Sequence, residues 1–101
     1  MWHKDIINLL QETKIYVTNS DSQLKSGHFQ EALTNMRVAF EATGKIFERM
    51  RGSSEEHDLK FLLNNLQELM QMIEGQDTYL SRLRIKIILK KIDQLLERSK
   101  A

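Results

Sequence analysis

The chain of 101 residues contains neither cysteine nor proline, and only four glycines. Without cysteine it can form no disulfide framework and no thiolate metal site, which is compatible with a reducing compartment, and we expect it in the cytoplasm. Apolar runs do not exceed three residues, as at Ile87 to Leu89, whereas a membrane-spanning helix needs roughly 20. Asp5 interrupts the apolar part of the N-terminus, so we expect neither a membrane span nor a signal peptide.

What the chain does contain is helical periodicity, which is clearest between Ser26 and Arg51. One stripe of this segment gathers Phe29, Ala32, Leu33, Met36, Ala39, Phe40, Ile46, Phe47 and Met50. Three further segments repeat the pattern, from about Trp2 to Lys25, from Ser53 to Gly75, and from Asp77 or Thr78 onwards. In the first segment the expected inward residues are Ile6, Leu9, Leu10, Tyr16, Val17 and Leu24. In the third they are Leu59, Leu62, Leu63, Leu66, Leu69, Met70 and Ile73. In the last they are Leu80, Ile85, Ile88, Leu89, Ile92, Leu95 and Leu96.

Helices of about 20 to 24 residues, joined by connections of about two to four residues, must lie antiparallel to their neighbours in the chain. We therefore predict an all-α fold, an antiparallel up-down-up-down four-helix bundle in which residues 1–101 form a single domain. The alternation of apolar and basic residues from Leu83 to Ile87 also resembles a strand. We predict a helix there, because helical spacing continues beyond it and no second strand exists to pair with it.

Three local features carry finer predictions. The run from Thr18 to Ser22 has short polar side chains that compete for backbone hydrogen bonds, so a kink or break of the first helix is expected there. Gly44 lowers helix stability by about 1 kcal/mol relative to alanine, which a close helix crossing would explain. Ser53 and Glu56 have the spacing of a capping box, which predicts the start of the third helix.

Charge is distributed unevenly, although the formal net charge is only +1. Arg37, Glu41 and Lys45 stand four residues apart, so we expect opposite charges to pair along an exposed face. Residues 52–77 carry six acids and one base (net −5), whereas residues 78–101 carry seven bases and two acids (net +5). We interpret this difference as mutual complementarity of two antiparallel helices.

The alternative interpretation of the basic segment is a surface for nucleic acid or an acidic partner. That surface would comprise Arg82, Arg84, Lys86, Lys90 and Lys91. The sequence pI of about 8.0 is lower than the value above 9 that is typical of a dedicated nucleic-acid-binding domain. Tyr79 is the one aromatic residue near these bases, so the sequence offers little for base stacking.

Residues suited to metal or cofactor chemistry are scattered. His3, His28 and His57 are far apart, and none pairs with another at the three- or four-residue spacing that puts two ligands on one helical face. A glycine-rich phosphate loop is absent from the sequence, and the acidic residues fall outside the apolar stripes. We therefore predict no metal site and no cofactor.

The segment EALTNMRVAFEATGKIF, from Glu31 to Phe47, resembles the helix with Ala, Arg, Glu and Lys at similar spacings in HEPN-like proteins, including the abortive-infection C-terminal type. The resemblance implies an antiparallel helical bundle. Many of these proteins are ribonucleases of defence and toxin systems, with an active-site Arg and His a few residues apart, usually assembled across a dimer. Arg51 and His57 are the corresponding candidates in this chain. Two departures from the pattern are that Arg51 precedes Gly52 in an expected turn and that residues 78–101 contain no His.

We predict a non-catalytic, HEPN-like protein-interaction module, and the resemblance implies a bacterial defence or regulatory assembly. The alternatives are a metal-independent ribonuclease that uses Arg51 and His57, and a nucleic-acid-binding module that uses the basic last helix. Trp2, Phe61 and Ile87 fall beside the apolar stripes, so we expect apolar surface to remain exposed there. Its expected occupant is another protein or a second copy of the chain in a homodimer.

Overall fold

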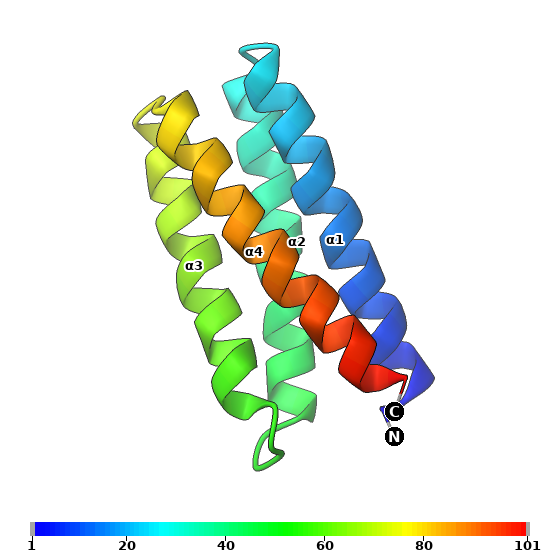
Figure 1. Cartoon of the computed structure of the whole chain (residues 1–101). Coiled ribbons are helices and arrows are strands. Elements are labelled where there is room, and N and C mark those ends of the chain that lie inside the picture. Colours follow the sequence, from blue (N-terminus) through cyan, green and yellow to red (C-terminus); the bar gives the residue numbers. More distant parts are fainter. Residues whose placement is uncertain (1, 101) are drawn as a thin grey trace.

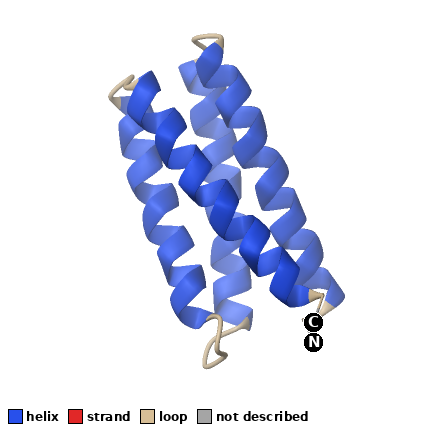
Figure 2. Ribbon diagram, in the orientation of Figure 1, coloured by secondary structure: helices blue, strands red, loops and turns tan. Residues whose placement is uncertain are grey.

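The computed structural model describes residues 2–100, and Figure 1 shows that they form a bundle of long helices. The helices are α1 (Lys4–Lys25), α2 (Phe29–Arg49), α3 (Glu56–Glu74) and α4 (Thr78–Ser99). The described residues between them form turns and short loops, with no strand (Figure 2). The predicted all-α four-helix bundle is therefore confirmed, and the segment from Leu83 to Ile87 is helical.

The helices surround a common axis, so that each contacts two neighbours: α1 and α3 both lie against α2 and against α4. Successive helices run in opposite directions, which places the start of α1 and the end of α4 at the same end of the bundle (Figure 1). The bundle measures 39 × 18 × 18 Å along its principal axes. This is the predicted up-down-up-down order, and it holds α4 between α1 and α3.

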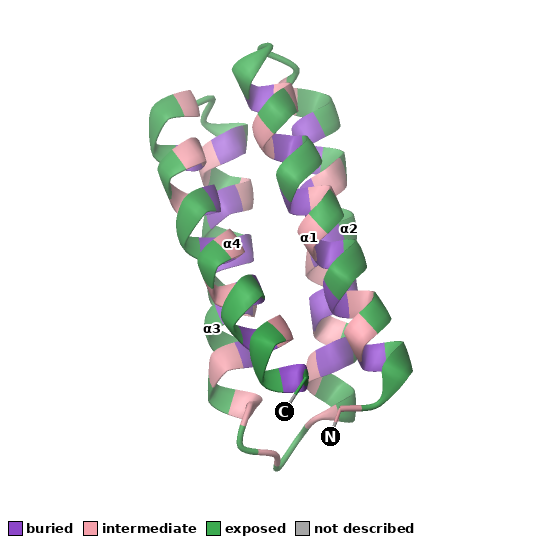
Figure 3. Ribbon diagram, turned by 45° about the vertical axis from the view of Figure 1, so that its right-hand side comes forward, coloured by how far each residue is buried: buried purple, intermediate pink, exposed green. Residues whose placement is uncertain are grey.

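The core lies between the helices and consists almost entirely of aliphatic side chains (Figure 3). It comprises Ile6, Leu10, Val17, Leu24, Ala32, Leu33, Met36, Ala39, Ile46, Leu59, Leu62, Leu66, Leu69, Ile73, Ile85, Ile88, Ile92 and Leu95. Each buried leucine or isoleucine contributes about 1.5–3 kcal/mol relative to an exposed one. Packing between the helices, rather than the helix propensity of each segment, therefore dominates stability.

The aromatic side chains predicted for the core of α2 lie at its edge instead. Phe40 and Phe47 are only half-buried, whereas the small residues Ala39, Ala42 and Thr43 are buried. Small residues on the buried face let α2 approach its neighbours closely, and the rings cover the rim of the contact. The other predicted core residues that are half-buried are Leu9, Tyr16, Phe29, Met50, Leu63, Met70, Leu89 and Leu96.

One predicted core residue of α4 lies outside the core. The side chain of Leu80 is 47% exposed, whereas its neighbour Ser81 is fully buried. The buried face of α4 includes Ser81, Ile85 and Ile88, and each residue turns the helix by about 100°. Leu80 therefore points away from the core, and the prediction for this residue was wrong.

The polar run from Thr18 to Ser22 does not break α1, contrary to expectation. The Thr18 hydroxyl donates to the Lys14 carbonyl oxygen at 2.8 Å. The buried Ser20 hydroxyl lies 3.0 Å from the carbonyl oxygens of both Tyr16 and Ala32, and thus joins α1 to α2. These hydroxyls find backbone partners that leave the helix intact.

The predictions for Gly44 and for the start of α3 also need correction. A Cβ atom at Gly44 would meet no described atom within 4 Å outside its own helical turns, so no close crossing explains this glycine. The third helix begins at Glu56 rather than Ser53, and the capping box does not form. The Ser53 hydroxyl accepts a hydrogen bond from the Glu55 backbone N–H at 3.3 Å, and Glu56 accepts one from the Gly52 N–H at 3.5 Å.

The predicted cap of the fourth helix is confirmed. The Asp77 carboxylate accepts a hydrogen bond from the Leu80 backbone N–H at 3.0 Å, which satisfies a first-turn donor of α4. The residue in left-handed conformation before it is Gln76, with φ of 57°, and not Gly75, where helix α3 stops.

Candidate interaction surface

Exposed apolar side chains gather on the outer face of α4. They are Tyr79, Leu80, Leu83 and Ile87, with exposed fractions of 72%, 47%, 40% and 49%. Their spacing places them along the first turns of one helix face, which we call the α4 stripe. Figure 3 shows the exposed side of α4 turned away from the other helices.

The α3 side chain that adjoins this face is Phe61, which is 38% exposed. The Lys91 ammonium lies 5.3 Å from the centroid of the Phe61 ring, and Lys91 follows Ile87 by one helical turn. Two of the predicted interface residues, Phe61 and Ile87, therefore lie on the same side of the molecule. The other large apolar residues that the described structure exposes are Ile15 of α1 and Val38 of α2, one on each helix.

The third predicted interface residue, Trp2, lies elsewhere. It is half-buried at the start of α1, where it packs against the core. With Ile7 and Leu96 it lines a groove of about 670 Å³ between α1 and the end of α4. Leu96 follows Ile87 by nine residues, or about 14 Å along the helix axis, so the groove and the α4 stripe are separate features.

Most of the predicted basic surface forms ion pairs within the bundle. Arg82 contacts Asp21 of α1 at 3.0 Å, and its hydrogen bond to Asp21, with the charge of that carboxylate, raises the pKa of Arg82 above its ordinary value. Arg84 contacts Glu68 of α3 at 2.9 Å and donates a hydrogen bond to the Asn65 side-chain oxygen at 2.7 Å. These bases hold α4 against both of its neighbours.

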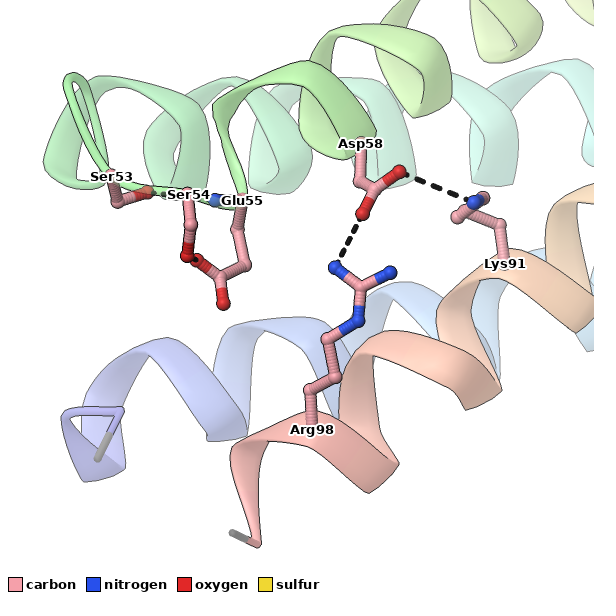
Figure 4. Close-up of polar contacts among 6 residues, drawn as sticks. All are labelled: Ser53, Ser54, Glu55, Asp58, Lys91 and Arg98. Carbon is pink, nitrogen blue, oxygen red and sulfur yellow. Dashed lines mark hydrogen bonds and ion pairs between the residues drawn. The ribbon is translucent and has the colours of Figure 1, made fainter.

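Asp58 forms a second charged contact between α3 and α4 (Figure 4). Its carboxylate accepts hydrogen bonds from Lys91, at 3.2 Å, and from Arg98, and its side chain is only 17% exposed. Desolvation by burial opposes ionisation of Asp58, but the hydrogen bonds and charges of Arg98 and Lys91 outweigh it and lower the pKa of Asp58 below its ordinary value. The predicted complementarity of the last two helices is confirmed for these pairs.

Two of the five predicted bases remain without such contacts. Lys86 and Lys90 are exposed, and neither forms an ion pair with another residue in the range 2–100. Both lie beside the α4 stripe. The sequence could not separate these lysines from the paired bases, because Asp21, the partner of Arg82, lies 61 positions away on α1.

The expected charge ladder on α2 is not formed. Among the described side chains, neither Arg37 and Glu41 nor Glu41 and Lys45 lie within the 4.0 Å of an ion pair. Exposed side chains four residues apart gain only about 0.3–0.5 kcal/mol from pairing and lose rotational freedom, so their spacing alone does not order them.

The candidate catalytic pair does not form a joint site in this conformation. Arg51, in the loop after α2, contacts Glu48 at 3.0 Å, and its guanidinium lies 5.8 Å from the Phe47 ring centroid. His57 is exposed in the first turn of α3. No hydrogen bond or ion pair joins Arg51 to His57 in the described part of the chain.

The histidines stand at the starts of three different helices. His3 caps α1 by accepting a hydrogen bond from the Asp5 backbone N–H at 3.2 Å, and His28 immediately precedes α2. Within residues 2–100, no cluster of three or more potential ligand side chains is arranged to hold a metal ion. None of the described helices combines the length and the apolar character that crossing a bilayer requires.

Comparison with known proteins adds no relative to this picture. No family model, no curated protein and no solved structure matches the chain.

Proposed function

We propose that the chain is a non-catalytic helical-bundle module that binds another protein through the α4 stripe. The observation that carries this proposal is the grouping of Tyr79, Leu80, Leu83 and Ile87 on one exposed helix face, next to Phe61. Grouped apolar side chains in water favour association, because a partner that covers them removes apolar area from solvent. Single exposed residues such as Ile15 carry no such implication.

The setting of this module is proposed from the resemblance of Glu31 to Phe47 to HEPN-like proteins. It supports a cytoplasmic role in a bacterial defence or regulatory assembly. A homodimer is the alternative form of the contact, in which a second copy of the chain covers the same face.

A site-specific photo-crosslinker tests the proposed binding face in cells that naturally express the protein. We expect a discrete adduct when the crosslinker replaces Leu83, and none when it replaces Ile15, which is 58% exposed on α1. Both positions carry an exposed aliphatic side chain, and Ile15 is the more exposed of the two, so a missing adduct at Ile15 reports on location rather than on accessibility. Equal labelling from both positions would contradict a binding face on α4.

Incubation of the purified protein with labelled RNA and a chelator tests the absence of catalysis. We expect the RNA to remain intact with the wild type and with His57→Ala alike. A metal-free ribonuclease needs a His to move a proton and an Arg to stabilise the phosphorane charge, and the Arg51 guanidinium contacts Glu48 instead. Metal-independent cleavage that disappears in His57→Ala would replace this proposal with the ribonuclease alternative.

A further inference from the structure

Basic residues border the α4 stripe on both sides. Residues 78–92 contain five bases and no acid. Arg82 reaches α1, and Lys86 and Lys90 follow it at four-residue intervals along the same edge. Arg84 and Lys91 reach α3 on the opposite edge. The apolar stripe therefore runs between two rows of positive charge.

The two rows differ in how far their charge is neutralised. On the edge toward α3, Arg84 and Lys91 are paired with Glu68 and Asp58. On the edge toward α1, Arg82 is paired with Asp21, whereas Lys86 and Lys90 form no ion pair among the described residues, although Asp93 and Glu97 line the same depression as both lysines. Unpaired cations beside an apolar surface favour a ligand that carries anionic groups next to apolar ones.

The surface along this edge is hollowed at two places. One depression, of about 360 Å³, is lined by Thr78, Tyr79, Arg82, Leu83 and Lys86. The next, of about 490 Å³, is lined by Lys86, Leu89, Lys90, Asp93, Gln94 and Glu97. Lys86 lines both, so the two depressions adjoin. The first offers apolar walls from Tyr79 and Leu83 with the basic groups of Arg82 and Lys86 at its rim, which suits an apolar side chain whose neighbour is a carboxylate. The second combines Leu89 with two lysines and with the acids Asp93 and Glu97, so its charge is mixed.

We infer that the α4 stripe, with Lys86 and Lys90, binds an acidic amphipathic helix of another protein. This inference rests on the proposed function and names the chemistry of the partner. An amphipathic helix presents apolar residues at positions i, i+3, i+4 and i+7, which suits the elongated apolar stripe. Acidic residues on the same helix would reach Lys86 and Lys90.

The charges also distinguish this partner from other occupants. A second copy that used the same face would bring the unpaired Lys86 and Lys90 of one α4 against those of the other, and juxtaposed like charges oppose association. A nucleic acid would neutralise Lys86 and Lys90 through its phosphates, but would leave the aliphatic side chains of Leu80, Leu83 and Ile87 poorly covered.

A pair of synthetic peptides tests the inference on the full chain. Both are labelled 18-residue helices with leucines at positions i, i+3, i+4 and i+7; one carries glutamates beside the leucines and the other lysines. Fluorescence anisotropy gives the affinity of each peptide. We expect the glutamate peptide to bind at least tenfold more tightly than the lysine peptide, with an advantage that shrinks as salt rises.

Matched variants locate the binding. The double variant Lys86→Glu, Lys90→Glu should weaken binding of the glutamate peptide about tenfold or more, whereas Lys45→Glu, on the exposed side of α2, should not change it. Leu83→Asp should abolish binding, and Ile15→Asp should not. Circular dichroism verifies that each variant is folded. If Leu83→Asp is unfolded, the affinity of the Lys86→Glu, Lys90→Glu variant for the glutamate peptide tests the inference instead.

The remaining outcomes would overturn the inference in distinguishable ways. Equal affinity for both peptides, no binding of the glutamate peptide, or equal effects of the variants and their controls would each refute an acidic helix as the partner. A dimer that Leu83→Asp dissociates would show that a second copy occupies the face, and the proposed binding face would stand. If the glutamate peptide did not bind and the crosslinker at Leu83 captured no protein, both the proposed function and the inference would be refuted.

Discussion

The α1–α2 hairpin and the α3–α4 hairpin are packed with different side chains. Between α1 and α2 the buried positions include many small or hydroxylated residues, namely Thr13, Ser20, Ala32, Ala39, Ala42 and Thr43. Between α3 and α4 they are mostly leucine and isoleucine, among them Leu62, Leu66, Leu69, Ile85, Ile88 and Ile92. The first hairpin can bring its backbones close together, whereas the second fills its interior with large side chains.

The polar contacts of the two hairpins differ in the same way. Uncharged groups join α1 to α2: the Ser20 hydroxyl at the Ala32 carbonyl oxygen, and the Asn35 amide, which donates to Gln23 at 2.6 Å. Charged groups join α3 to α4, at Asp58 and at Glu68. Among residues 2–100, the second hairpin also exposes several large apolar side chains on one helix, whereas α1 and α2 expose one each. We infer that the first hairpin serves mainly the fold and that the second carries the binding face as well.

The largest expected effects come from opposite changes of side-chain volume in the two hairpins. Leu66→Ala should lower the free energy of unfolding by about 2–5 kcal/mol, because it leaves a cavity among large residues. Ala39→Leu should cost about 1–3 kcal/mol, because a fully buried alanine on α2 leaves no space for a larger residue. Urea denaturation measures both changes. A neutral Ala39→Leu would show that α1 and α2 are not packed closely around this residue.

The next largest effect concerns the charged contact of Asp58 with Lys91 and Arg98, which joins α3 to α4. Asp58→Asn should lower the free energy of unfolding by about 1–2 kcal/mol, because it removes a carboxylate that accepts hydrogen bonds from both Lys91 and Arg98. Because the pKa of Asp58 is lower in the folded protein than its ordinary value near 3.8, the unfolded chain binds more protons as the pH falls. Its contribution is therefore complete above that ordinary value and is lost as the pH falls through the lowered folded pKa.

Denaturation across a pH series measures this contribution as the difference between wild type and Asp58→Asn. The difference should be constant at neutral pH and should shrink only at acidic pH, as the carboxylate of the folded wild type becomes protonated. A difference that stayed constant into strongly acidic solution would mean that hydrogen bonds to either side chain, rather than the charge of Asp58, stabilise the contact.

The sequence predicted the architecture because every helix has a continuous apolar stripe and glycine or a capping residue at its ends. It did not predict which members of a stripe lie deepest. On α2 the apolar stripe is broad enough to include both Ala39 and Phe40, and in the structure Ala39 is buried whereas Phe40 is only half-buried. On α4, Leu80 is 47% exposed and Ser81 is buried, although only Leu80 is apolar.

The candidate site was predicted in part. Phe61 and Ile87 were identified as apolar residues beside the stripes, and Lys86 and Lys90 were among the candidate bases. The segment from Leu80 to Leu89 has apolar residues around most of the helix, which is more than one buried face can hold. This excess of apolar residues is the sequence feature that could have predicted the other exposed residues of the α4 stripe. Trp2 and Phe61 lie on different parts of the surface because of how the helices pack, and the spacing of residues along the chain does not reveal that packing.

Each hairpin also has one position where alanine should stabilise the protein, by about 0.5–1 kcal/mol. Gly44→Ala should do so in α2, because the added Cβ meets open space and alanine restricts the unfolded chain. Ser81→Ala should do so in α4, because the buried Ser81 hydroxyl has no hydrogen-bond partner among the described residues. Thermal melts measure both. A lower melting temperature for Gly44→Ala would indicate that α2 is more crowded near this residue.

The smallest expected effects compare an exposed acid from each hairpin. Glu41 of α2 has no ion pair within the described residues, so Glu41→Ala should change the free energy of unfolding by less than about 0.5 kcal/mol. Glu68 of α3 contacts Arg84, whose side chain is only 27% exposed, so Glu68→Ala should cost about 0.5–1 kcal/mol. Urea denaturation at low and high salt measures both, and only the effect of Glu68→Ala should shrink with salt. If Glu41→Ala cost as much as Glu68→Ala, the charges of α2 would be ordered in solution after all, and the contrast between an uncharged and a charged hairpin would not hold.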